Sequence, residues 1–191
     1  NENFAEFPEN VRWMKNGVVF ATLHVVGSDN ALADFDAASS AKRSDADDAE
    51  VQRRINAVNS WIEQTFAIAE KKGAAGVMFF MQANPVLEVD YALSTNSKGT
   101  VPRRGFNPIL KTLENRVSAF GKPVVLAHGD SHYFRIDKPT LPTKSDGLEV
   151  FHPNFTRVEN FGDDKQHWVK VTVDPASRNV FSFEAQIVEG N

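Results

Sequence analysis

The sequence contains no cysteine, and this absence excludes disulfides, thiolate-bound zinc and cysteine nucleophiles. Any metal or catalytic centre must therefore use His, Asp, Glu, Asn, Gln or hydroxyl side chains. An excess of positive charge is also lacking. The formal net charge is −4, whereas a general nucleic-acid-binding protein needs a basic surface to displace counterions from phosphates. We therefore expect no general nucleic-acid binding.

Long apolar segments and targeting signals are missing as well. The longest apolar run, residues 74–81, is too short to cross a bilayer, so no transmembrane segment is expected. The chain begins Asn1-Glu2-Asn3 rather than with Met, as a processed protein or a fragment of a longer one would. Its 191 residues fit one domain (1–191), and this length can bury a substantial core.

The middle of the chain contains one unit twice: an amphipathic helix, a glycine-containing turn and a buried strand. The first unit has an apolar stripe over residues 51–69, a turn at 71–73 and a strand over 76–81. In the second unit, a helix starts at Asn107-Pro108 and a strand follows over 124–127. This alternation of helices and strands predicts an α/β fold.

Further strands are predicted on both sides of these units. The turn signal Asn16-Gly17 precedes an apolar run over residues 18–26, which is typical of a strand covered on both faces. Near the C-terminus, residues 154–160, 166–173 and 180–188 alternate between polar and apolar side chains. This pattern predicts an antiparallel flank of the sheet.

Polar side chains follow the buried strands, where ligands bind in open α/β sheets. His128, Asp130 and His132 follow the last buried strand at a spacing of two, and Gln82 and Asn84 follow the preceding one. If residues 128–132 stay extended, two imidazoles and a carboxylate project to one side, which suits zinc, manganese or iron. A turn in which Asp130 bonds its own backbone explains the same residues equally well.

Two further groups of residues are candidates for the same edge of the sheet. Asp29 and Asn30 follow the first strand, where they can line the site or simply build a turn. Arg135 can hold an anionic group because a guanidinium matches the geometry of phosphate, although solvated surface charge is the alternative explanation.

The chain order resembles the second half of the calcineurin-like metallophosphoesterases. The segments that carry the resemblance are Gly-Val-Met-Phe-Phe-Met-Gln-Ala-Asn-Pro (76–85) and Val-Val-Leu-Ala-His-Gly-Asp-Ser-His-Tyr-Phe-Arg (124–135). In that family the first strand ends in a metal-ligating His, and the second ends in a Gly-His-x-His loop. Residues 13–30 also look like the central strand and Gly-Ser-x-Asn loop of a bacterial, often exported branch.

The resemblance implies a layered sandwich of helices packed on mixed β-sheets, of which this chain lacks the N-terminal half. It also implies hydrolysis of a small-molecule phosphate ester with divalent metal ions (Mn, Fe, Zn or Mg). Gln82, Asp130 and His132 occupy the family's metal-ligand positions, with His128 beside them and Asn84, Asp29 and Asn30 nearby. The catalytic residues remain unknown, and a secreted or periplasmic location is favoured over a cytoplasmic one.

The sequence departs from the family pattern in two respects. No Asp-x-His, Gly-Asp or Gly-Asn-His motif precedes residue 82, so we expect the C-terminal portion of a longer protein. Gln82 and Asp130 stand where the family has imidazoles, which favours harder metals or lower affinity. The alternative function is a degenerate member that binds a ligand or partner at the strand ends without hydrolysis.

Overall fold

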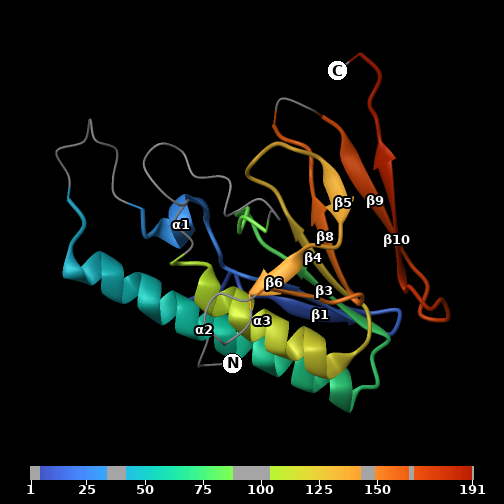
Figure 1. The fold of residues 1–191 in the computed structure, drawn as a ribbon, viewed down its shortest axis with the longest axis horizontal. Coiled ribbons are helices and arrows are strands. Elements are labelled where there is room, and N and C mark those ends of the chain that lie inside the picture. The colour runs from blue at the N-terminus through green and yellow to red at the C-terminus, as the bar shows by residue number, and fades with distance from the viewer. Residues whose placement is uncertain (1–4, 34–41, 88–103, 143–148, 164–165, 191) are drawn as a thin grey trace.

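The computed structural model describes residues 5–33, 42–87, 104–142, 149–163 and 166–190. In chain order, its elements are β1 (Arg12–Lys15), β2 (Val18–Thr22), α1 (Gly27–Ala31), α2 (Asp45–Lys71), β3 (Gly76–Phe80), α3 (Asn107–Phe120), β4 (Val124–His128), β5 (Arg135–Asp137), β6 (Thr140–Pro142), β7 (Glu149–Phe151), β8 (Phe155–Glu159), β9 (Trp168–Val173) and β10 (Phe181–Gln186). Figure 1 shows this order from blue to red.

Six strands form one mixed sheet in the order β1-β2-β3-β4-β8-β5. The four inner strands run parallel, while β1 and β5 are antiparallel to their neighbours at the two edges. The register aligns Thr22 with Phe80, and Phe80 with Ala127. Strands β2, β3 and β4 therefore end at the same edge of the sheet, and the segments that follow them start close together.

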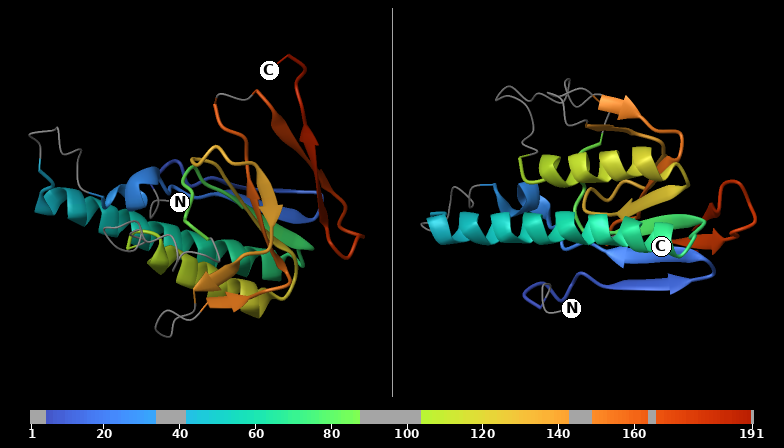
Figure 2. Two further views of the ribbon diagram at one scale, coloured as in Figure 1. Left: turned by 45° about the horizontal axis from the view of Figure 1, so that its top comes forward. Right: turned by 90° about the horizontal axis from the view of Figure 1, so that it is seen from below.

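Helices α2 and α3 lie side by side on one face of this sheet (Figures 1 and 2). The face that they cover presents alternate residues of each parallel strand, because side chains point to opposite sides along a strand. The core between helices and sheet contains fully buried side chains from both layers, including Ile62, Phe66, Phe79, Leu110, Leu126 and Phe155. Burying a side chain of this size stabilises the fold by about 1.5–3 kcal/mol.

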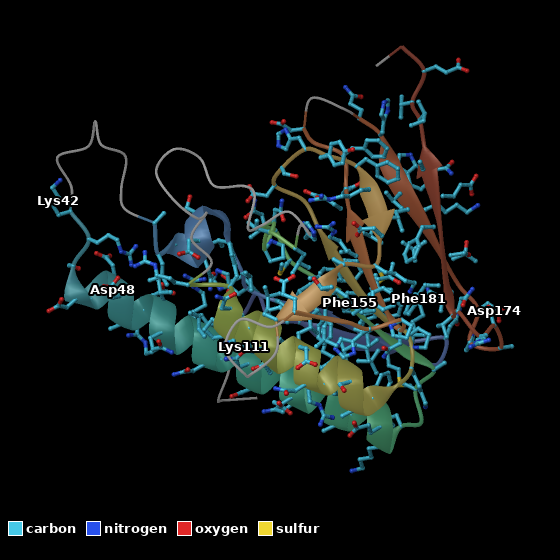
Figure 3. The ribbon with its side chains drawn as sticks, viewed as in Figure 1. Lys42, Asp48, Lys111, Phe155, Asp174 and Phe181 are labelled. Carbon is cyan, nitrogen blue, oxygen red and sulfur yellow. The ribbon has the colours of Figure 1, made fainter. Side chains whose placement is uncertain are left out.

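The β9–β10 hairpin covers part of the opposite face. Its inward residues Val169, Val171 and Phe183 pack with Val125 and Val158 of the sheet. The two strands pair antiparallel, as the alternating pattern predicts, and the turn between them contains Asp174 (Figure 3). This hairpin and the helices enclose the sheet between two unlike layers.

One strand has a different partner from the predicted one. Strand β8 was expected in the antiparallel flank, but it pairs parallel to β4 inside the main sheet. Its alternation of polar and apolar residues does not mean that one face meets water, because Arg157 and Glu159 are buried. Arg157 forms an ion pair with Asp137, and Glu159 pairs with Arg135 of β5.

Local sequence signals account for several element ends. Asn16 and Gly17 both have positive φ, as the turn of a two-residue hairpin requires. The side chains of Ser44 and Asp47 form a reciprocal capping box at the start of α2, and Gly121 ends α3 in a left-handed conformation. Strand β2 ends at Thr22, four residues before the predicted end of its apolar run.

The structure confirms a mixed α/β fold, whereas the complete layered sandwich of the metallophosphoesterases remains a prediction. The short strands β5, β6 and β7 were not predicted from the sequence. Within the described ranges, no helix combines the length and the apolar character needed to cross a bilayer.

The capping box provides a test of the helix start. We expect Ser44→Ala to lower the free energy of unfolding by about 1 kcal/mol, because the backbone N–H of Asp47 loses its side-chain acceptor. Urea denaturation followed by circular dichroism measures this change. Ser60→Ala is the control, because Ser60 is exposed within the same helix. Equal destabilisation by both substitutions would argue against the cap.

Candidate functional site

The candidate site is formed by three segments at the carboxyl edge of the sheet. Residues 23–31 follow β2, residues 81–87 follow β3 and residues 129–134 follow β4. Because these three strands are parallel neighbours, their following segments meet at one edge, as expected for the ligand-binding edge of an α/β sheet. The structure therefore brings together the strand-end segments in which the sequence predicts the site.

Gln82 connects all three segments through its side chain. The backbone N–H of Gly27 donates to Gln82 Oε1 at 2.9 Å, and Gln82 Nε2 donates to Asp130 Oδ1 at 3.0 Å. The backbone of Gly129 also donates to the carbonyl of Gln82. A Cβ on Gly27 would lie 3.0 Å from Asp130 Oδ2, so a glycine leaves room for this carboxylate.

Asn30 and Asp29 join the same edge to the start of α3. The carboxylate of Asp29 accepts the backbone N–H of Gly105 at 2.9 Å, and Asn30 Nδ2 donates to the Gly105 carbonyl at 3.1 Å. The amide oxygen of Asn30 accepts from Val26 N–H and from the guanidinium of Arg54 on α2. Asn30 is fully buried, so these bonds satisfy groups that water cannot reach.

Backbone strain is concentrated at this edge. Among the described residues, nine non-glycine residues have positive φ, and seven of them follow β2, β3 or β4: Ser28, Asp29, Asn30, Ala31, Val86, Asp130 and His132. Positive φ is especially unfavourable for a β-branched residue such as Val86. Each such conformation costs on the order of 1–3 kcal/mol, and residues of this kind cluster at ligand sites.

The segment after β4 is a turn, not an extended continuation of the strand. Asp130 and His132 both have positive φ, so the side chains of residues 128–132 do not project together to one side. His132 Nδ1 lies 3.3 Å from Asp163 Oδ1, whereas Asp130 is bonded to Gln82. The extended arrangement considered for this loop is therefore wrong.

His128 is the last residue of β4 and is buried, with 4% of its surface exposed. Its Nδ1 lies 3.1 Å from the carbonyl oxygen of Gly129. Desolvation lowers the pKa of His128, because burial penalises the charged imidazolium, and the hydrogen bond to Gly129 and the carboxylate of Glu159 oppose this effect. A neutral His128 donates from Nδ1 to that carbonyl oxygen.

Glu159 is a buried carboxylate next to this strand end that the sequence did not identify. It accepts from the Ser131 hydroxyl and from Nε of Arg135, at 2.6 Å in the second case. The predicted anion-binding residue Arg135 is thus engaged with a carboxylate of the protein. No local signal marks Glu159, because it occurs in an ordinary alternating strand pattern.

Two cavities lie beside Asp130. The smaller, of about 300 Å³, has oxygen-bearing side chains in its wall, namely Ser28, Asp29, Asn84, Asp130 and Ser131. The larger, of about 420 Å³, lies between the sheet and β9 and has mainly apolar walls. Gln82 lines only the larger cavity, whereas Asp130 lines both.

The fit of a divalent metal ion depends on which oxygens are available. In the part of the chain that the structure describes, no three His, Cys, Asp or Glu side chains are grouped as a metal site. Gln82 does not fit as a ligand in this arrangement, because its oxygen accepts from Gly27 and its NH₂ group faces Asp130. The oxygen-lined cavity fits a hard cation better, since Asp29 and Asp130 supply two carboxylates, although the amide oxygen of Asn84 accepts the backbone N–H of Val86 at 2.9 Å.

A scan of protein-family models and a search of curated protein sequences found no match to this chain. The geometry of the site therefore carries the functional argument.

The sequence also failed to identify Arg54 and Gly105. Arg54 lies on an amphipathic helix, where a charged residue normally faces water, yet it is 2% exposed and bonded to Asn30. Gly105 looked like an ordinary loop glycine, but a Cβ there would overlap the carbonyl oxygen of Asp29. The buried arginine at position 54 and the need for glycine at position 105 become evident only from the packing of segments that are distant in sequence.

Substitution of Gly105 tests the attachment of the first segment to α3. Gly105→Ala is expected to lower the free energy of unfolding by about 1–3 kcal/mol, because the new methyl group displaces the backbone of Asp29. Gly129→Ala is the control, since its Cβ would meet no atom closer than 3.9 Å. Thermal and urea unfolding of both variants measure the difference. A Gly105→Ala protein as stable as the control would contradict this packing.

Burial of His128 predicts a pH effect on stability. The unfolded chain takes up a proton at the ordinary histidine pKa of about 6.5, whereas the folded protein does so only at lower pH. Below about pH 6.5 the unfolded state therefore binds more protons, and the free energy of unfolding falls until the folded pKa is passed. We expect His128→Gln to lose less stability than the wild type between about pH 7 and about pH 5.

Urea unfolding at a series of pH values measures this difference. His167→Gln, in the segment just before β9, is the control for removing a histidine. Parallel stability curves for the wild type and His128→Gln would show that His128 does not titrate differently in the two states.

Proposed function

We propose that this protein is a metal-dependent phosphoesterase that binds a phosphate ester at the carboxyl edge of β2, β3 and β4. The observation that carries the proposal is the oxygen-lined cavity of about 300 Å³, to which all three strand-end segments contribute. The resemblance to calcineurin-like phosphoesterases implies metal ligands at the same edge. Geometry and chain order thus support the same position for the site.

Electrostatics link the metal to the substrate. Asp29 and Asp130 both line the cavity, and two carboxylates repel a phosphate dianion. A divalent cation held by these oxygens would reverse that repulsion. Oxygen ligands favour hard cations such as Mg²⁺ or Mn²⁺ over zinc. When bound, such an ion neutralises charge on the phosphoryl oxygens and lowers the pKa of a coordinated water.

The residues of this chain have distinct roles in the proposal. Asp130 holds the cation. Gln82 positions the Asp130 side chain, because its hydrogen bond of 3.0 Å fixes Oδ1 of that carboxylate. His132 remains the ligand implied by the resemblance. Arg104, whose Nε lies 3.5 Å from Asp29 Oδ2, is exposed and can bind a phosphoryl oxygen.

A second candidate function is ligand binding without hydrolysis. It is favoured by the hydrogen bonds at the site, because both polar atoms of the Gln82 amide are already engaged and His132 faces Asp163. A protein of this kind would keep the phosphoesterase fold and its strand-end cavity but would lack a functional metal centre.

Metal analysis together with hydrolysis of 4-nitrophenyl phosphate in Mn²⁺ tests the phosphoesterase. We expect stoichiometric metal and turnover in a longer natural polypeptide that supplies the family's remaining motifs, with little or no turnover from residues 1–191 alone. In that longer polypeptide, kcat/KM should fall at least about 100-fold in Asp130→Asn, because a neutral amide is a weaker ligand. Asp45→Asn is the matched control, since Asp45 is exposed in the first turn of α2. The same measurements on any longer natural polypeptide containing this chain complete the test.

The outcomes separate the two functions. Metal binding and turnover that depend on Asp130 support the phosphoesterase. Absence of both from the chain and from the longer polypeptide supports binding without hydrolysis. Turnover that survives Asp130→Asn would contradict the role assigned to this carboxylate.

A further inference from the structure

The larger cavity beside Asp130 has features of a binding cleft for an organic group. Its walls include Met78, Phe80 and Val158 from the sheet, Val171 and Trp168 from β9, and Phe161 from the segment between β8 and β9. Its volume of about 420 Å³ suffices for a bicyclic molecule. Apolar walls with a few polar groups at one end are typical of small-molecule sites.

Aromatic rings are prominent in this cleft, and their neighbours hold two of them in place. Phe80 stacks with Trp13, with ring centroids 6.0 Å apart and planes 13° apart. Phe161 stacks on Phe134 at 4.3 Å. The third ring, Trp168, is half exposed at the cleft and therefore accessible to a ligand. Aromatic rings with fixed orientations favour ligands that contain a planar aromatic ring, because such ligands form offset-stacked or edge-to-face contacts with them.

The polar end of the cleft lies where the proposed phosphoesterase site begins. Gln82, Asp130 and Asn160 line this end, and Asp130 also lines the oxygen-bearing cavity. A molecule with its apolar part in the larger cavity and its polar part in the smaller one would therefore contact Asp130.

We propose that the cleft between the sheet and β9 binds the aromatic alcohol group of the substrate, which is then a phosphate ester of a planar aromatic alcohol. The substrate class rests on the proposed function, whereas binding of the free alcohol does not. The ring lies between Phe80, Phe161 and Trp168, and its oxygen points toward Asp130. The phosphoryl group occupies the neighbouring oxygen-lined cavity.

Binding of 2-naphthol, measured by isothermal titration calorimetry without metal, tests this proposal. Decahydro-2-naphthol is the matched probe, because it has the same carbon skeleton and hydroxyl group but no planar ring. We expect 2-naphthol to bind at least about fivefold more tightly, since only the planar ring stacks on the aromatic walls. Equal affinities, or no saturable binding of 2-naphthol, would overturn the proposal.

Two substitutions place the probe in the cleft. Trp168→Ala is expected to weaken 2-naphthol binding roughly five- to tenfold, because it removes one aromatic wall. Ala127→Leu is expected to weaken it as well by filling part of the cleft, and it keeps the test valid if Trp168→Ala fails to fold. Phe151→Ala is the control, because this exposed aromatic ring of β7 does not line the cleft. Unchanged binding in the folded Trp168 and Ala127 variants would overturn the placement.

Failure of this proposal is distinguishable from failure of the proposed function. Saturable 2-naphthol binding, with neither metal binding nor hydrolysis in this chain or in the longer polypeptide, would leave the cleft assigned and refute the phosphoesterase. Hydrolysis of 4-nitrophenyl phosphate without 2-naphthol binding would support the phosphoesterase and refute the cleft.

Discussion

The parallel pairing of β3 with both β2 and β4 is the constraint on which the candidate site depends. Hydrogen bonds between these strands set the register that brings Thr22, Phe80 and Ala127 level across the sheet. The segments that follow then have to share a small volume at one edge. Gln82 has contacts with both neighbouring segments because its strand is the central one of the three. Displacement of β3 along its neighbours would remove these hydrogen bonds together.

Hydrogen bonds to buried polar groups stabilise the strained segments of this edge. Seven residues with positive φ would each cost on the order of 1–3 kcal/mol. Hydrogen bonds to charged groups contribute about 1.5–3 kcal/mol each, and several surround the strained residues, such as those from Arg54 to Asn30 and from Gly105 to Asp29. The same bonds fix the conformation of the segment, so that the strained backbone has a single arrangement.

The repeated helix–strand units, and the meeting of the strand ends that form the candidate site, could be predicted, because hydrophobic periodicity and turn signals are local properties. The parallel partner of β8 could not, since its polar residues Arg157 and Glu159 are buried by ion pairs with distant residues. The conformation of the loop at Asp130 was also beyond local signals, because extended and turn forms fit the same sequence. Likewise, the hydrogen bond between Gln82 and Asp130 joins residues 48 positions apart in sequence.

The larger cleft also depends on contacts between residues that are distant in sequence, which local sequence patterns do not indicate. Each of its aromatic residues lies in a strand or loop where an aromatic side chain is ordinary and does not by itself indicate a binding cleft. Their grouping arises only because the β9–β10 hairpin folds back over the sheet, which brings Trp168 near Phe80. A composition of 10% aromatic residues gives no indication of such a grouping.

The bonds of buried Asn30 have a consequence for how the sequence can vary. Its side chain serves Arg54 on α2 and Gly105 before α3 at once, so no substitution at one of these positions leaves the other two unaffected. A smaller residue at position 30 would leave a buried guanidinium without one acceptor. Positions 30, 54 and 105 should therefore change together among related sequences, although up to 75 residues separate them along the chain.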